Sequence, residues 1–104
     1  MLLLFNKISF RTNRDITRTY STSFSQAVSF LDGETRDAIY GIYGFVKLAD
    51  EIVDTFHDFD KEHLLEKFED DYNYARENGI SLNPVMNSFM ITVKKYNVQD
   101  ELIR

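Results

Sequence analysis

The chain has 104 residues, of which 43% are hydrophobic and 14% aromatic, so it can form one small domain with an apolar core but not two domains. Seventeen acidic residues outnumber twelve basic ones to give a net charge of −5, which argues against nucleic acid as a partner. The chain contains no cysteine, which excludes disulfide scaffolds, thiolate zinc sites and cysteine nucleophiles, and no segment resembles a transmembrane span or a signal peptide, so we expect a soluble, cytoplasmic protein.

Helix-breaking residues are scarce, with one proline and four glycines, and the clusters of valine, isoleucine and threonine that are typical of strands are missing. The fold is therefore expected to be an all-α helical bundle. A first helix is predicted at about residues 4–19 and a second at about residues 23–31, where apolar residues recur at helical spacing. Asp32 and Gly33 then predict a break, at which Asp32 caps the next helix by accepting hydrogen bonds from its free amides.

The third predicted helix, at about residues 34–56, is the longest and has two distinct sides. At about 100° per residue, one side gathers apolar residues that we expect to be packed in protein: Ala38, Ile39, Ile42, Phe45, Val46, Ala49, Ile52, Val53 and Phe56. The opposite side forms a stripe within an arc of about 80°. The stripe combines charged residues with tyrosines: Arg36, Tyr40, Tyr43, Lys47, Asp50 and Asp54.

Further helices are predicted in the second half of the chain. A charged connection at about residues 58–63 leads to a fourth helix, which is expected to end at Asn78 and Gly79. A fifth helix is expected to begin near Pro84, a residue suited to a first helical turn, and to run to about Tyr96. Residues 99–104 have the pattern of one or two more helical turns.

Asp50 and Asp54 are four residues apart, so on a helix their carboxylates share one face, with Cβ atoms about 6 Å apart. Two like charges at this distance repel, and in an otherwise buried helix they favour a bound cation, for which magnesium is the hard, oxygen-preferring choice. Magnesium uses one or two carboxylates and completes its coordination with water and phosphate, which suits a diphosphate substrate. Glu51, at the edge of the stripe, is a further candidate ligand. The alternative interpretation, a solvated acidic face, stays open.

Other candidate sites are weaker. His57 and Asp58 lack the further histidines that a metal phosphohydrolase needs, since the chain's one other histidine is His63. The acidic residues at 66–71 are typical of a solvated helix face. Glycine-rich phosphate loops, catalytic serine triads and paired zinc ligands are absent from the sequence.

Three groups of residues, in this order and spacing, carry a resemblance to a known family. They are Tyr20-Ser21-Thr22-Ser23-Phe24-Ser25; Arg36 with Ala38-Ile39-Tyr40-Gly41-Ile42-Tyr43-Gly44-Phe45; and Lys47 with Asp50-Glu51-Ile52-Val53-Asp54. Together they resemble the N-terminal third of the squalene and phytoene synthases, and a looser similarity continues to residue 98. The resemblance implies an isoprenoid synthase fold, of which residues 1–104 would be a partial domain.

The resemblance also implies an activity. Enzymes of this family join two identical prenyl diphosphates, usually farnesyl or geranylgeranyl diphosphate, head to head to give squalene-, dehydrosqualene- or phytoene-type products. Asp50, Tyr43 and Asp54 match catalytic positions, and the two aspartates match the first aspartate-rich motif, which holds Mg²⁺, or Mn²⁺ in its place, against the diphosphate. The residues do not indicate whether NADPH reduces the product. The matching substrate-binding positions are Tyr20, Ser21, Ser23, Phe24, Val28, Tyr43 and Lys47.

Three positions depart from the family's usual pattern. Lys47 stands where an arginine usually contacts diphosphate, which keeps the charge but loses the bidentate fork. Glu51 replaces a frequent aspartate, and Tyr20 stands where many members have histidine.

Further expectations follow for the chain as a whole. The family's second aspartate-rich motif would lie beyond residue 104, so we expect this chain to be inactive alone. Uncovered apolar faces of the third and last helices predict self-association. Long prenyl substrates imply contact with a membrane surface, and without a visible anchor any attachment is expected to be peripheral. Two alternatives stay open: a non-catalytic helical module that binds metal or diphosphate, and a protein-interaction domain.

Overall fold

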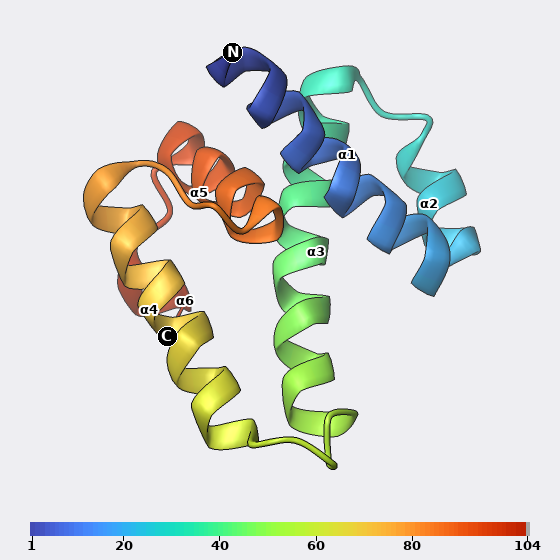
Figure 1. The fold of residues 1–104 in the computed structure, drawn as a ribbon. Coiled ribbons are helices and arrows are strands. Elements are labelled where there is room, and N and C mark those ends of the chain that lie inside the picture. Colours follow the sequence, from blue (N-terminus) through green and yellow to red (C-terminus); the bar gives the residue numbers. More distant parts are fainter. Residues whose placement is uncertain (104) are drawn as a thin grey trace.

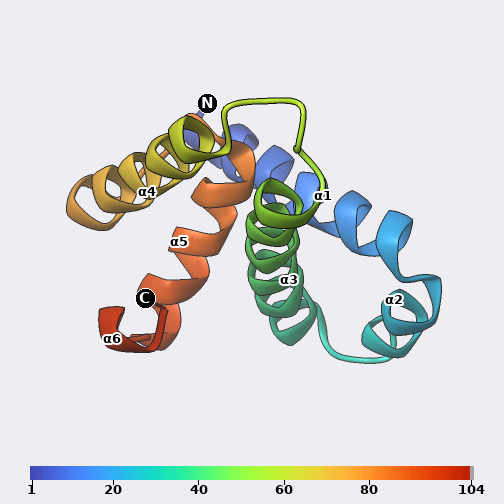
Figure 2. The ribbon, with the colours of Figure 1, turned by 90° about the horizontal axis from the view of Figure 1, so that it is seen from below.

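The computed structural model describes residues 1–103, and every regular element within them is an α-helix, which confirms the expected all-α class. In both views α3 lies in the middle, with α2 on one side of it and α4 and α5 on the other (Figure 1, Figure 2). No helix among the described residues has the length and hydrophobicity needed to cross a membrane. The helices are α1 (Leu2–Tyr20), α2 (Thr22–Val28), α3 (Gly33–Asp54), α4 (Lys61–Asn78), α5 (Pro84–Tyr96) and α6 (Asp100–Ile103).

The helix ends follow from local chemistry. The predicted cap at Asp32 is confirmed, because its carboxylate accepts a hydrogen bond from the Thr35 amide at 2.9 Å. Asn83 caps α5 in the same way, with Pro84 in the first turn where its missing N–H costs nothing. Gly79 ends α4 in the left-handed conformation, with φ of 77°, which glycine adopts without steric penalty.

Three predicted helix boundaries are wrong by a few residues. The fourth helix begins at Lys61, inside the connection predicted at residues 58–63, because the Asp60 carboxylate caps it by accepting a hydrogen bond from the His63 amide at 3.1 Å. The second helix stops at Val28 rather than Leu31, because the amides of residues 30 and 31 bond three residues back and form a turn. The third helix stops at Asp54 rather than residue 56, because the amides of residues 55 and 56 both bond to the Glu51 carbonyl. Helix α6 confirms the final helical turn as far as Ile103, whereas residue 104 lies outside the described residues.

An apolar core lies between α4, α5 and the middle of α3. Phe45 from α3 stacks on Phe89 of α5, with ring centroids 3.8 Å apart, and also on Phe68 of α4 at 5.2 Å. Aromatic pairs of this kind contribute more stabilisation than their buried area alone provides, so Phe45 links α3 to both α4 and α5. The buried residues of this core are Tyr72, Ala75, Met86, Phe89, Met90 and Val93.

The contact of α1 with α3 and α5 is polar instead. Ser9, Asn13 and Thr17 recur every four residues on α1, and all three are fully buried. The Asn13 amide donates to the Gly41 carbonyl at 3.3 Å and to the Ser88 hydroxyl. Such a buried polar seam is stable because its polar groups are almost all paired, each hydrogen bond contributing about 1 kcal/mol net.

Two glycines of α3 allow this close approach. A Cβ on Gly41 would lie 2.6 Å from the Thr92 hydroxyl, and a Cβ on Gly44 would overlap the Asn13 side chain. The prediction that the whole apolar side of α3 is packed is therefore wrong. Because α1 and α5 pack over the glycines, Ile42 and Val46 lie outside this contact and remain 45% and 49% exposed, and Val53, further along α3, is 49% exposed as well.

Candidate functional site

The corner between α1 and α2 places the first group of predicted site residues against α3. Ser21 interrupts the helix with an extended backbone, and its hydroxyl accepts a hydrogen bond from the Phe24 amide at 3.3 Å. This cap satisfies one of the free amides at the start of α2 and so fixes where the short helix begins. The Ser21 side chain therefore has a structural partner within the corner, while Ser23 is exposed beside it.

An aromatic pair joins α2 to α3. The ring of Phe24 stacks on that of Tyr43 with centroids 5.5 Å apart and an angle of 24° between the planes. Phe24 keeps 40% of its surface exposed, so the pair forms an accessible aromatic surface rather than a closed core. Val28, one turn later, is buried and acts as the packing residue of α2.

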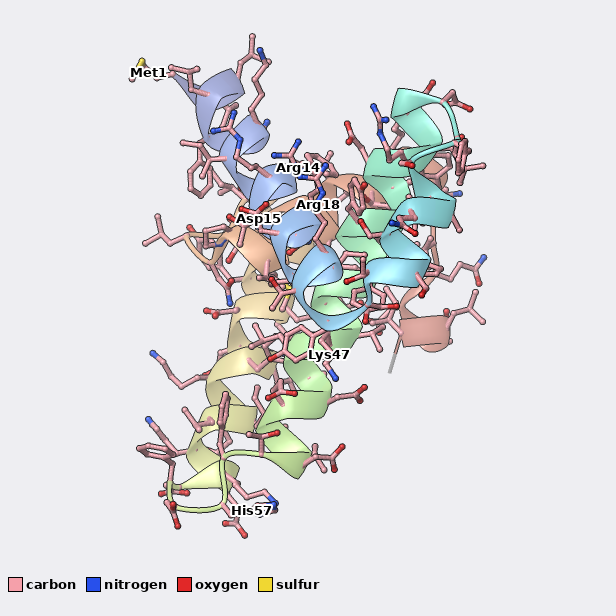
Figure 3. The ribbon with its side chains drawn as sticks, turned by 90° about the vertical axis from the view of Figure 1, so that its right-hand side faces the viewer. Met1, Arg14, Asp15, Arg18, Lys47 and His57 are labelled. Atoms are coloured by element: carbon pink, nitrogen blue, oxygen red, sulfur yellow. The ribbon has the colours of Figure 1, made fainter. Side chains whose placement is uncertain are left out.

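A cationic contact lies one helical turn beyond Tyr43 on α3. The Lys47 ammonium lies 4.4 Å from the centroid of the Tyr20 ring, which comes from the last turn of α1. The same ammonium lies 3.7 Å from a carboxylate oxygen of Glu51. Figure 3 shows Lys47 beside the end of α1. Tyr20 and Glu51 therefore hold the flexible lysine side chain from two directions, by a cation–π contact and an ion pair.

Asp50 and Asp54 lie further along the same helix. Both are exposed, and among residues 1–103 neither carboxylate has a hydrogen-bond or ion-pair partner. Asp54 is seven residues beyond Lys47, or about 10 Å along the helix axis at 1.5 Å per residue. The premise that this pair belongs to an otherwise buried helix is only partly right, because Ile52 is buried between the two aspartates whereas Val53 beside them is 49% exposed.

The charges of this face decide what it can bind. Lys47 supplies one positive charge, whereas Asp50, Glu51 and Asp54 supply three negative ones. A diphosphate, itself strongly negative, would be repelled by this face unless a divalent cation were bound there. The two free carboxylates fit magnesium, which takes one or two such ligands and fills its remaining positions with water and phosphate oxygens. Within the described part of the chain, no group of three acidic, histidine or cysteine side chains is placed to hold a metal.

The structure thus brings most of the predicted residues to one face, which we call the α3 face. It consists of Tyr20, Phe24, Tyr43, Lys47, Asp50, Glu51 and Asp54, whereas Ser21 caps the corner next to it and no contact joins Ser23 to it. Sequence reasoning did not identify the contact between Tyr20 and Lys47, because residues 27 positions apart give no periodic signal. The Ser21 cap could have been found, since serine before a short helical pattern is a common N-terminal signal.

Comparison with known proteins adds an independent finding. The sequence model for squalene/phytoene synthases matches residues 17–104, a segment that contains the whole α3 face. No curated protein and no solved structure matches the chain significantly. Because the match spans most of the chain, the protein belongs to the squalene/phytoene synthase family.

Proposed function

We propose that the α3 face is one wall of an active site that condenses two prenyl diphosphates head to head. Farnesyl or geranylgeranyl diphosphate is the expected substrate, and a squalene-, dehydrosqualene- or phytoene-type hydrocarbon the expected product. The proposal rests on one observation: an aromatic pair, a lysine and two aspartates without partners among the described residues lie on one face. The family match includes all of these residues.

Each group on this face has a role that its chemistry supports. Asp50 and Asp54 would hold Mg²⁺, which when bound neutralises charge on the leaving diphosphate. Lys47, already oriented by Tyr20 and Glu51, donates hydrogen bonds to phosphate oxygens. The ring of Tyr43 presents a π-face to the positive charge that develops on an allylic group as its diphosphate leaves.

The apolar part of the substrate needs a surface as well. Phe24 stacks on Tyr43, which lies seven residues before Asp50 on α3, so this pair would offer an apolar surface to a prenyl chain whose diphosphate is held at the aspartates. Glu51, paired with Lys47, supplies a negative charge that Lys47 would exchange for phosphate when a diphosphate binds. We assign Glu51 this role in addition to its expected role as a metal ligand.

A calorimetric titration tests the binding half of this proposal. Inorganic pyrophosphate is titrated into the chain with and without Mg²⁺, and we expect binding that requires the metal and is lost in Asp50→Asn with Asp54→Asn. The matched control is Glu66→Gln with Asp70→Asn, which neutralises another exposed acidic pair four residues apart, on α4. Metal-dependent binding that survives in the Asp50 and Asp54 variant would show that the site lies elsewhere.

Product analysis tests the catalytic half. We propose that the 104-residue chain alone forms no hydrocarbon from farnesyl or geranylgeranyl diphosphate, because its described residues offer two free metal ligands on a single wall. Extraction and chromatography after incubation with Mg²⁺ would detect any product, and its presence would contradict the proposed inactivity. A non-catalytic binding module would also bind pyrophosphate without forming product. A longer chain of the same protein would distinguish the two functions, because the proposed enzyme would then form hydrocarbon and a binding module would not.

A further inference from the structure

A hollow between α1 and α3 takes no part in the proposed function. Its volume is about 660 Å³, within the range of about 300–1,000 Å³ that sites for small molecules occupy. It shares no lining residue with the α3 face, and it borders α1 from Met1 to Arg14. Figure 3 shows these two residues on α1, with Arg18 further along the helix. The hollow is therefore a candidate site for a ligand other than the diphosphate at the α3 face.

The lining of this hollow is basic, although the whole chain carries a net charge of −5. Three cations, Lys7, Arg11 and Arg14, line it against a single carboxylate, that of Asp37. Asp37 also lines a neighbouring hollow together with Lys95, which offsets part of its negative charge. The lining side chains of the first hollow thus carry a net charge of +2, which favours a ligand with two negative charges.

Arg14 lines the hollow with a guanidinium that the protein leaves without a hydrogen bond. Its Nε is buried and has no hydrogen-bond partner among residues 1–103. The contact of Nε with an oxygen of Asp15 spans 3.9 Å, which is too long for a hydrogen bond. A buried donor without an acceptor costs free energy, so the unused donors of Arg14 favour binding of an anion in the hollow.

Tyr40 adds a second unused donor, from the α3 side of the hollow. Only 2% of its surface is exposed, and its hydroxyl forms no hydrogen bond with any other described residue. Buried tyrosine hydroxyls usually have a partner, so this one indicates a ligand atom or water in the hollow. The sequence pattern placed Tyr40 on one stripe with Tyr43 and Lys47, whereas the structure places it in this separate hollow.

Apolar side chains form much of the remaining lining. Leu3, Leu4 and Phe10 lie beside the cations of α1, and Leu3 is four residues from Lys7 on one helical face. A ligand that matches this lining carries a doubly charged anionic group next to an apolar group. A phosphate monoester has this chemistry, because above a pKa of about 6 its phosphate carries nearly two negative charges and offers three acceptor oxygens.

We infer that the hollow binds a water-soluble phosphate monoester whose other part is apolar or aromatic. Arg11 and Arg14 hold the phosphate, since a guanidinium can donate two parallel hydrogen bonds to phosphate oxygens. The Tyr40 hydroxyl donates a further hydrogen bond from α3. Leu4 and Phe10 contact the apolar part of the ester. The inference stands independently of the proposed function, because the two sites share no residue.

Other ligands fit the hollow less well. A carboxylate carries one negative charge, so it would leave half of the net charge of the lining unbalanced. A phosphate fixed in the surface of a bilayer would reach the exposed side chain of Arg11 but not the almost fully buried Tyr40. A small ester that enters the hollow from solution reaches both.

Calorimetric titration of the full chain with phenyl phosphate tests the inference. EDTA is present, because without a metal the three carboxylates of the α3 face repel an anion. Arg14→Gln should weaken binding about tenfold, since it removes charge-assisted hydrogen bonds. Tyr40→Phe keeps the ring, removes the hydroxyl and should weaken binding about fivefold. The matched control, Arg18→Gln, removes the same charge from α1 outside the hollow and should bind like the wild type.

Two further measurements locate and identify the ligand. In NMR spectra, phenyl phosphate should shift the Nε–H signal of Arg14 and leave that of Arg18 in place. Benzoate, which has one negative charge, and inorganic phosphate, which has no apolar part, should each bind about tenfold more weakly than phenyl phosphate. Circular dichroism of each variant checks that the helices are retained.

Several outcomes would overturn the inference. They include a wild-type chain that does not bind phenyl phosphate, and equal losses in the Arg14 and Arg18 variants, which would show attraction to the charge of α1 alone. Benzoate binding as tight as that of phenyl phosphate would contradict a site for a dianion. Displacement of phenyl phosphate by vesicles that contain phosphatidic acid would assign the site to a lipid headgroup. Loss of binding in Lys47→Gln would place the ligand at the α3 face.

Discussion

Replacing Gly44 by alanine should destabilise the protein although alanine is the better helix former. An added Cβ would overlap the amide group of Asn13, and it would lie 2.9 Å from the Asn13 Cβ. Neither group can move freely, because Asn13 is fully buried and donates hydrogen bonds to Gly41 and Ser88. The substitution must therefore push α1 away from α3 or break the hydrogen bonds of Asn13.

The size of the effect follows from three contributions. Overpacking a rigid contact costs about 3 kcal/mol, at the upper end of the usual range, because the obstacle is a buried amide rather than a flexible chain end. Loss of one Asn13 hydrogen bond costs about 1 kcal/mol. Alanine in place of glycine in a helix recovers about 1 kcal/mol. The expected net loss is about 3 kcal/mol, or about 10–20 °C in the melting temperature of a domain of this size.

Urea unfolding followed by circular dichroism measures this loss. Gly33→Ala is the matched control, because its nearest neighbouring atom lies 3.7 Å away on the Arg36 side chain, and its stability should change by less than about 0.5 kcal/mol. An Asn13→Ala background removes the amide group and leaves only the Cβ of residue 13, at 2.9 Å, in the way, so Gly44→Ala should then cost much less than in the wild type. An equal loss with Asn13 present and absent would refute the argument that the two side chains compete for one space.

Three further predictions concern single contacts. Tyr20→Leu should abolish the upfield ring-current shift of the Lys47 side chain in NMR spectra, whereas Tyr20→Phe should keep it; a shift unchanged in the leucine variant would place Lys47 away from the ring. Hydrogen bonds from the Thr35 amide and hydroxyl lower the pKa of Asp32 from its ordinary 3.8, so its contribution to stability is complete above pH 3.8 and is lost as the pH falls through the lower folded-state pKa. The stability difference between the wild type and Asp32→Ala should therefore narrow in acid, and a constant difference would contradict this cap. Burial, and then the hydrogen bond to Asp100, raise the pKa of Tyr72 above 10.0, so the stability that protonated Tyr72 contributes is lost as the pH rises past 10.0. Tyr72→Phe should therefore reduce this alkaline loss of stability. An alkaline loss that is unchanged in the variant would show that Tyr72 ionises freely.

The helices themselves were largely predictable, because their signals are local. Asp32, Asn83 and Gly79 mark helix ends through interactions with residues two to four positions away, and each was placed correctly or within a residue or two. The errors at residues 29–31 and 55–56 arise where a turn competes with a last helical turn. The energies of those two backbone arrangements are too similar for the local sequence to separate.

The packing was less predictable. Periodicity placed Ile52 correctly on the packed side of α3, but it also put Tyr40 on the polar stripe, and the structure buries Tyr40, Gly41 and Gly44 while Ile42 and Val46 stay exposed. Hydrophobicity is a poor guide here because the partner, α1, presents Asn13 and its neighbouring polar residues. A glycine opposite an asparagine is favourable only when the two helices pack closely together. How closely they pack depends on the tertiary structure and is not encoded in either segment of sequence alone.

The sequence alone determined which family the chain belongs to, because motif order and spacing are carried by the chain itself. For the candidate site it indicated the candidate residues, among them Val28, which the structure buries. The spacing of Asp50 and Asp54 on one helical face is likewise local. Only the tertiary structure decided that Tyr20 meets Lys47 and that Phe24 meets Tyr43. Those contacts join residues that are far apart in sequence, and the contact between Tyr20 and Lys47 depends on how closely α1 packs against Gly44 of α3.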